Sequence, residues 1–329
     1  MSQSTDRRQA QPHSIQAIIR DNCGLRLYVP PIAWTSDQLR LLTCHFNLQK
    51  GRGKQAHDNG GRVTDGTTQI KPERWRHSQL MRTATKLARI STLVAKKFAV
   101  EEILNAYDIH ISDYKCLSFY FNHRPVVKLA TDGVFSSNSV TPSLAYITFD
   151  SIQSLRKKHV YTPPYRMVNV PGLRLRQKKL DSLTPQNPVE DPYIAAILIA
   201  LAQEQRRRLQ QEGSQGEGGN IITKNQTSHM DADTTSTARS SSPSTEQMAL
   251  NTANSFKVLA LSGVAADALY VYTANIPSGF LDKFDEPLHY SPSCPVAITY
   301  CRVPLASSNL LRKLHRLLCA GSCSFCSCN

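Results

Sequence analysis

The stretch VEDPYIAAILIALAQEQRRR, residues 189–208, carries the clearest structural signal in the chain. Asp191 suits a helix cap, and Pro192 follows at the first helical position, where its missing N–H costs nothing. The ten apolar residues that follow are too few to cross a bilayer, which needs about 20. The stretch therefore predicts a buried core helix. Its closing arginines, residues 206–208, complement the helix dipole in the last turns, with Gly213 just beyond the end.

Strand patterns lie on both sides of this helix. Before it, residues 116–121 and 125–130 predict a hairpin, and residues 144–149 predict a third strand. After it, residues 256–262 and 268–276 predict a second hairpin. A short helix from Ser278, a strand over 295–301 and a final helix over 307–319 follow. The pattern predicts one mixed α+β domain with a capped buried helix and a hairpin-rich sheet.

Two polar regions divide the chain. Residues 211–254 are rich in Ser, Thr, Gly and Asn and hold no aromatic residue, which predicts a disordered insertion. Residues 1–71 predict an irregular basic region with one short helix capped by Ser36 or Asp37. Residues 72–210 and 255–318 are then the two halves of the domain, and residues 319–329 are a cysteine-rich tail. The proline-punctuated segment 157–179 predicts an extended basic arm.

The positive charge lies in the first two thirds of the chain. Residues 1–210 hold 31 lysines and arginines against 16 acidic residues, whereas residues 211–329 hold 8 against 9, for a net charge of +14. Residues 50–97 are the densest part, with twelve basic and three acidic residues. Such a field attracts phosphate backbones or anionic lipid, although it is also compatible with a solvated face that has no partner.

An amphipathic helix over residues 78–98 concentrates part of this charge. Its apolar side is predicted to hold Leu80, Ala84, Leu87, Val94 and Phe98. Polyanion contacts are predicted from this region and from the basic arm: Arg74, Arg76, Arg82, Lys86, Arg89, Lys96, Lys97, Arg174, Arg176, Lys178 and Lys179.

Motifs for common enzyme chemistry are absent. The chain has no Walker A, G-x-G-x-x-G, G-x-S-x-G or H-E-x-x-H motif, and no cofactor is predicted. A metal-dependent nuclease needs clustered carboxylates on or beside a strand, and Asp267, Glu190 and Asp191 are the candidates near one. Asp108, His110 and Asp113 form another small polar group, for which surface or turn roles are favoured over a metal.

The C-terminal tail holds Cys319, Cys323, Cys326 and Cys328. Their close spacing is cramped for a tetrahedral zinc site, although loose zinc or Cu(I) binding is chemically reasonable. A leucine-rich basic helix precedes them, over residues 310–318, so acylation and attachment to an anionic membrane surface is a second interpretation. A frayed end without function is the interpretation that the sequence favours, and disulfides are the one that it favours least.

Two stretches carry a resemblance to other proteins: residues 189–208, and the pair FKVLAL with LYVYTANIPSGFLDKFDEP. Over roughly residues 110–305 the chain resembles an uncharacterised family of filamentous-fungal proteins. The resemblance implies an intracellular fungal protein and implies no activity, cofactor or catalytic residue.

The sequence favours a non-enzymatic protein that binds DNA, RNA or another polyanion through its basic N-terminal half. The alternatives are a nuclease-like enzyme of degenerate type and a membrane-associated adaptor acylated at its last cysteines. Because residues 1–19 lack an apolar signal region, we expect a nuclear or cytoplasmic protein that is not secreted.

Overall fold

The computed structural model describes residues 10–49, 74–90, 92–112, 116–137, 141–162, 170–215, 255–261, 268–289, 295–305 and 310–319. The side chains of residues 74–77, 212–215, 255–261 and 319 lie outside the description. Statements below about what is absent concern this part of the chain.

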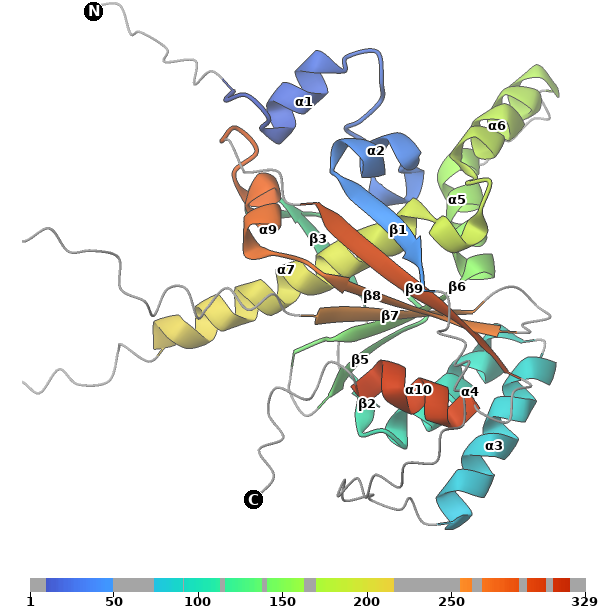
Figure 1. Ribbon diagram of the computed structural model, residues 1–329. Helices are drawn as coiled ribbons and strands as arrows, with labels where there is room; N and C mark the ends of the chain where they lie inside the picture. Colours follow the sequence, from blue (N-terminus) through green and yellow to red (C-terminus); the bar gives the residue numbers. More distant parts are fainter. Residues whose placement is uncertain are drawn as a thin grey trace, which may run out of the picture.

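A seven-stranded mixed sheet lies at the centre of the molecule, in the order β1-β9-β8-β7-β6-β5-β2 (Figure 1). Its strands are β1 Cys44–Leu48, β2 Ile109–Ile111, β5 Gly133–Ser137, β6 Leu144–Thr148, β7 Ser255–Leu261, β8 Ala268–Asn275 and β9 Val296–Pro304. β6 pairs with β7 in parallel, and β7, β8 and β9 form an antiparallel meander. Strands from both sides of the long insertion therefore build one sheet, and the predicted α+β class is confirmed.

The larger layer covers one face of this sheet. Its centre is α7 (Pro192–Gln215), whose residues 193–202 are at most 2% exposed. The predicted hairpin is formed by β3 (Leu117–Phe121) and β4 (Arg124–Leu129), and β3 packs beside α7. The remaining elements are α1 Ile15–Asp21, η1 Pro31–Ala33, α2 Ser36–Leu41, α5 Phe149–Tyr161, α6 Val170–Leu183, η2 Pro188–Glu190 and α9 Ser278–Asp285.

Three helices cover the opposite face: α3 Arg74–Arg89, α4 Leu93–Asn105 and α10 Leu310–Cys319. The strands supply both cores because successive side chains alternate between faces. On β6, Ala145 and Ile147 face the α7 layer, whereas Leu144 and Tyr146 face the layer of α3, α4 and α10. This second layer lies at the bottom of Figure 1.

Buried polar contacts fix the start of α7. Asp191 caps the helix, since the backbone N–H of Tyr193 donates to Asp191 Oδ1 at 2.9 Å. The same carboxylate pairs with Arg156 of α5 through two bonds of 2.7 and 2.5 Å, and neither side chain is more than 3% exposed. Tyr272 on β8 donates to the carbonyl of Val189 at 2.6 Å, which ties the preceding turn to the sheet. Burial raises the pKa of the Tyr272 hydroxyl, so it remains a donor at neutral pH.

The prediction of an irregular N-terminal region is wrong for residues 15–48. They form α1, η1, α2 and β1, and β1 is the edge strand that pairs in parallel with β9. The predicted short helix exists as α2, but Thr35 is its cap, in a reciprocal capping box with Gln38. Short elements with few periodic positions are difficult to recognise in sequence because tertiary packing stabilises them.

The single helix predicted over residues 78–98 is two helices. α3 ends at Arg89 and α4 begins at Leu93 after the capping residue Thr92. The break changes the helical phase, so Val94 and Phe98, predicted to be buried, are 66% and 64% exposed. Thr92 has an extended backbone with ψ of 138°, which interrupts the helical conformation before α4.

The prediction of an extended arm over residues 157–179 is also wrong. Most of the segment belongs to α5 and α6, and residues 163–169 lie outside the described ranges. Thr148 caps α5 by accepting from the N–H of Ser151 at 3.0 Å. Pro163 and Pro164 follow the end of α5, and Pro171 is the second residue of α6, where proline is tolerated. The prolines thus mark helix boundaries.

The end of α7 lies further along the chain than predicted. The helix continues to Gln215, so Gly213 is inside it and the arginines of residues 206–208 are not in its last turns. Arg206 instead pairs with Asp282 at 2.6 Å and with Asp285, both on α9. Arg206 therefore does not compensate the dipole at the end of α7. It joins α7 to α9 through these two ion pairs.

Candidate functional site

α3 presents a basic stripe to solvent. Arg82, Lys86 and Arg89 are exposed, and their i, i+4, i+7 spacing places them along one side of the helix over about 10 Å. The opposite side is apolar, with Ala84 and Leu87 fully buried against the sheet layer. The stripe thus follows from an amphipathic helix whose apolar side is used by the core.

α10 presents a second basic stripe. Arg312 and Arg316 are exposed, whereas Lys313 donates from Nζ to the carbonyl of Arg302 at 2.7 Å. The hydroxyl of Tyr107 donates to the carbonyl of Leu311 at 3.1 Å, which holds α10 beside the end of α4. The orientation of the helix is therefore fixed by both apolar and polar contacts.

The two stripes belong to neighbouring helices. Leu87 of α3 and Leu314 and Leu318 of α10 line the same narrow void in the core. α3 holds five lysines and arginines, α10 holds three, and neither helix holds an aspartate or a glutamate. In the described part of the chain, no carboxylate forms an ion pair with Arg82, Lys86, Arg89, Arg312 or Arg316. We call these five side chains the basic surface.

The predicted residues on α4 do not join the basic surface. Lys96 is 0% exposed, and burial lowers the pKa of its ammonium group while nearby Asp150 opposes the shift. It cannot reach a phosphate without leaving the core. Lys97 Nζ lies 3.7 Å from Glu101 Oε1, so part of its charge is already compensated. Sequence periodicity placed both on a solvated arc because it assumed one continuous helix.

Arg74 and Arg76 lie in the first turns of α3, and their side chains are outside the description. The polyanion contacts predicted on α6 are far from α3. The helix α6 packs on α5 in the other layer, and Figure 1 shows α6 and α3 on opposite sides of the sheet. Arg174, Lys178 and Lys179 are exposed there. Arg176 donates to the carbonyl of Tyr161 at 3.1 Å and lies over that residue's ring. The structure therefore separates the predicted contacts into two groups.

Two of the three carboxylates considered for a nuclease centre have structural partners within the described chain. Asp191 is held by Arg156, and Glu190 Oε1 accepts from the hydroxyl of Tyr300 at 2.9 Å. Asp267 lies outside the described residues, as does Asp113. Asp108 adopts a positive φ of 55° at a turn, and His110 Nδ1 contacts Asn105 Oδ1 at 3.2 Å. Both observations agree with turn and surface roles.

The tail cysteines are mostly beyond the described chain. Cys319 ends α10 without a described side chain, and Cys323, Cys326 and Cys328 lie outside the ranges. Within those ranges, no group of three or more His, Cys, Asp or Glu residues could hold a metal ion. The membrane-attached adaptor, one of the alternatives from sequence, has the apolar side of α10 on lipid, whereas the structure buries it in the core: Leu310, Leu311, Leu314 and Leu318 are at most 6% exposed. No described helix combines the length and the apolar character needed to cross a bilayer.

Cys44 on β1 is expected to resist alkylation. Burial raises the pKa of its thiol from 9.0 to about 12, which lowers the thiolate fraction near neutral pH about a thousandfold. Iodoacetamide at pH 8 should modify the exposed Cys23 in the folded chain and Cys44 only after unfolding in urea. Peptide masses would show both sites, and equal modification rates in the folded chain would contradict the placement of β1.

The chain was compared with family models, curated protein sequences and solved structures, and nothing matches in any of the three.

Proposed function

We propose that this protein binds nucleic acid through its basic surface, with the phosphodiester backbone as the principal contact. One observation carries the proposal: two helices of the same layer, α3 and α10, expose five cationic groups and hold no acidic residue. Four of the five are arginines, whose planar guanidinium groups can donate two hydrogen bonds to one phosphate.

The anchoring of both helices supports this proposal. Their apolar sides form part of the core, so the charged side chains project from rigid elements and require little ordering of backbone on binding. The sequence predicted phosphate contacts on α3, whereas Arg312 and Arg316 entered only the alternative of a membrane-attached helix. Only the placement of α10 beside α3 brings the two stripes onto one layer of the molecule.

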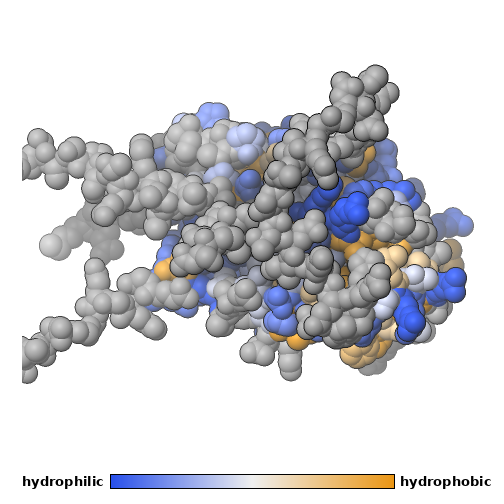
Figure 2. All heavy atoms as spheres, turned by 60° about the horizontal axis from the view of Figure 1, so that its bottom comes forward, coloured by the Kyte–Doolittle hydropathy of each residue, from blue (hydrophilic) through white to orange (hydrophobic). Residues whose placement is uncertain are grey.

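Anionic lipid is the competing target for a basic surface. A helix that binds stably to a membrane surface buries apolar side chains in the lipid, in addition to attracting anionic headgroups. The leucines of α10 are already buried in the protein core. Apolar surface does reach solvent on this side of the molecule, as Figure 2 shows. Leu93, Val94 and Phe98 of α4 are exposed apolar residues. Phe98 is 64% exposed on a helix of the same layer as the cationic groups, and its ring offers a stacking surface for an unpaired base, which supports single-stranded nucleic acid within the proposal.

The test measures binding of the full chain to a fluorescent single-stranded DNA of about 25 nucleotides over a salt series. Five phosphate contacts give an expected slope of about −3.5 in log K against log salt, hence about a hundredfold loss of affinity between 50 and 200 mM. A parallel sedimentation assay uses vesicles containing phosphatidylserine. We expect binding to DNA and little to vesicles. No DNA binding at low salt, or preference for vesicles, would overturn the proposal.

A further inference from the structure

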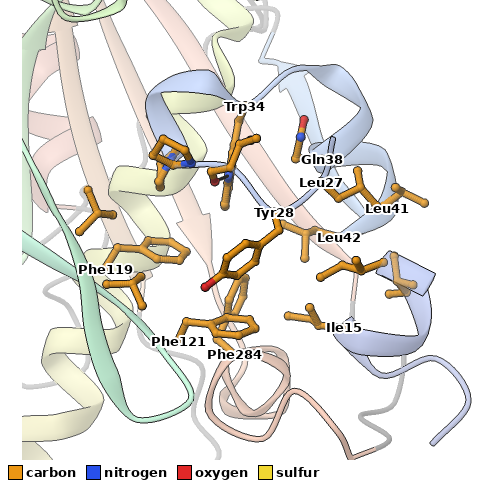
Figure 3. Close-up of a pocket in the computed structure, with 17 residues that line it drawn as sticks. Ile15, Leu27, Tyr28, Trp34, Gln38, Leu41, Leu42, Phe119, Phe121 and Phe284 are labelled. Carbon is orange, nitrogen blue, oxygen red and sulfur yellow. Dashed lines mark hydrogen bonds between the residues drawn. The ribbon is translucent and has the colours of Figure 1, made fainter. Parts of the chain in front are cut away.

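A second candidate site lies in the α7 layer, far from the basic surface. It is a cavity of about 280 Å³ between α1, the segment of residues 27–34, α2, the β3–β4 hairpin and α9. Figure 3 shows side chains from these elements converging on it, with Phe119 and Phe121 of β3 on one side and Leu41 and Leu42 on the other. It is much larger than the cavity of about 150 Å³ that holds a benzene molecule in a well-packed core.

Aromatic rings form a fixed wall of this cavity. Trp34 contacts Phe119 edge to face, with ring centres 5.6 Å apart, and Phe119 contacts Phe284 of α9 in the same way at 5.5 Å. All three side chains are at most 5% exposed, so packing holds them in place. Tyr28 lies against Phe121 with ring centres 5.9 Å apart and is 73% exposed. The wall is thus formed before any ligand arrives, and the cavity meets solvent beside Tyr28.

The polar side-chain groups of Gln38 and Trp34 on the cavity wall are already used within the protein, whereas no hydrogen bond is described for the Tyr28 hydroxyl. Gln38 donates from Nε2 to the carbonyl of Arg26 at 3.0 Å, and its Oε1 accepts from the backbone N–H and the hydroxyl of Thr35. Trp34 Nε1 donates to the carbonyl of Val29 at 3.3 Å. No charged residue lines the cavity in the described chain. A ligand charge would therefore lose its hydration without gaining a partner.

We propose that this cavity is a binding site for an uncharged, largely apolar small molecule about the size of two fused six-membered rings. The volume sets the size of the ligand, since pockets for larger, drug-sized ligands start at about 300 Å³. The lining sets its chemistry, because apolar side chains and aromatic faces offer dispersion contacts, the Tyr28 hydroxyl can form one neutral hydrogen bond, and no cation faces the cavity within the described chain. The site is independent of nucleic-acid binding, because it lies across the sheet from α3 and α10.

Two probes of nearly equal shape test the chemistry. The full chain is titrated with 2-acetylnaphthalene, which is neutral, and with naphthalene-2-carboxylate, which is an anion at neutral pH. Trp34 fluorescence reports on binding in a Trp75→Phe background, since the chain holds two tryptophans. We expect saturable binding of the neutral probe, at least about tenfold tighter than binding of the anion, because the carboxylate would be buried without a partner.

A matched pair of variants tests the location. Val126 lines the cavity rim and is 50% exposed, whereas Val170 on α6 is 53% exposed and lies outside the cavity. Val126→Trp places a large ring at the rim, so affinity for the neutral probe should fall at least about tenfold, while Val170→Trp should leave it unchanged. Calorimetry measures binding here, because the new tryptophan alters the fluorescence.

The proposal is overturned by any of three results: no saturable binding of the neutral probe, equal affinity for the anion, or equal affinity of the two variants.

Discussion

Asp191→Ala is expected to lower the free energy of unfolding by about 3–5 kcal/mol, because it leaves the Arg156 guanidinium buried without its counter-ion. The carboxylate accepts two hydrogen bonds from Arg156 and one from the backbone of Tyr193, at the start of the most buried helix of the molecule. Arg156 Nε already lacks a hydrogen-bond partner within the described chain, so no alternative acceptor is at hand. Urea denaturation followed by circular dichroism measures the change.

Two further variants separate the contributions at this position. Asp191→Asn keeps an oxygen to cap α7 but removes the charge, so most of the loss should remain. Asp37→Ala breaks an exposed pair with Arg40, whose atoms are 3.6 Å apart, and should cost no more than about 1 kcal/mol. If Asp191→Ala were as mild as Asp37→Ala, the buried pair would not hold α5 to α7. A large loss would also explain why Asp191 is unavailable as a metal ligand.

Leu314→Ala is the second substitution with a large expected effect, a loss of about 2–4 kcal/mol in the free energy of unfolding. Leu314 is 1% exposed and lies in the core between α10, α3 and the sheet. Removing most of its side chain creates a cavity under α10 that the rigid neighbours cannot fill. Thermal and urea unfolding of the full chain would measure the loss.

This prediction also decides between two roles for α10. A membrane-lying helix would expose its leucines to lipid, so truncating one would weaken vesicle binding and leave stability unchanged. Leu175→Ala on α6 is the matched control, since that leucine is 70% exposed and should contribute less than about 0.5 kcal/mol. Equal stability of the two variants would contradict the docking of α10 in the core.

The parts of the fold that sequence predicted best are those with strong local signals. The cap at Asp191, the proline after it and the apolar run fixed the start of α7, and alternating strands on either side predicted both hairpins. The end of α7 was missed because the three arginines suggested a helix terminus. Arg206 pairs with Asp282 and Asp285, and Arg207 contacts the Tyr120 hydroxyl, all of which are distant in sequence. Arg208 pairs with Glu204, one turn earlier on the same helix, at 3.3 Å.

The candidate sites depend more on tertiary structure than on local pattern. Lys96 was predicted to be a phosphate contact because periodicity cannot detect a helix break that turns one lysine inward. The pairing of Arg156 with Asp191 spans 35 residues and has no sequence signature. The apolar cavity combines α1, α2, β3, β4 and α9, so no single segment predicts it. The exposure of Arg82, Lys86 and Arg89 along one side of α3 could be predicted because their spacing lies within one helix.

The most direct test of nucleic-acid binding through the basic surface compares two triple variants across the salt series. Arg82→Gln, Lys86→Gln and Arg89→Gln together remove three of the five proposed contacts, so the slope should fall from about −3.5 to about −1.4. Arg174→Gln, Lys178→Gln and Lys179→Gln remove the same charge from exposed positions on α6, across the sheet, and should leave the slope unchanged. Equal slopes for the two triple variants would show that net charge, rather than the surface formed by α3 and α10, governs binding, and would contradict the proposal.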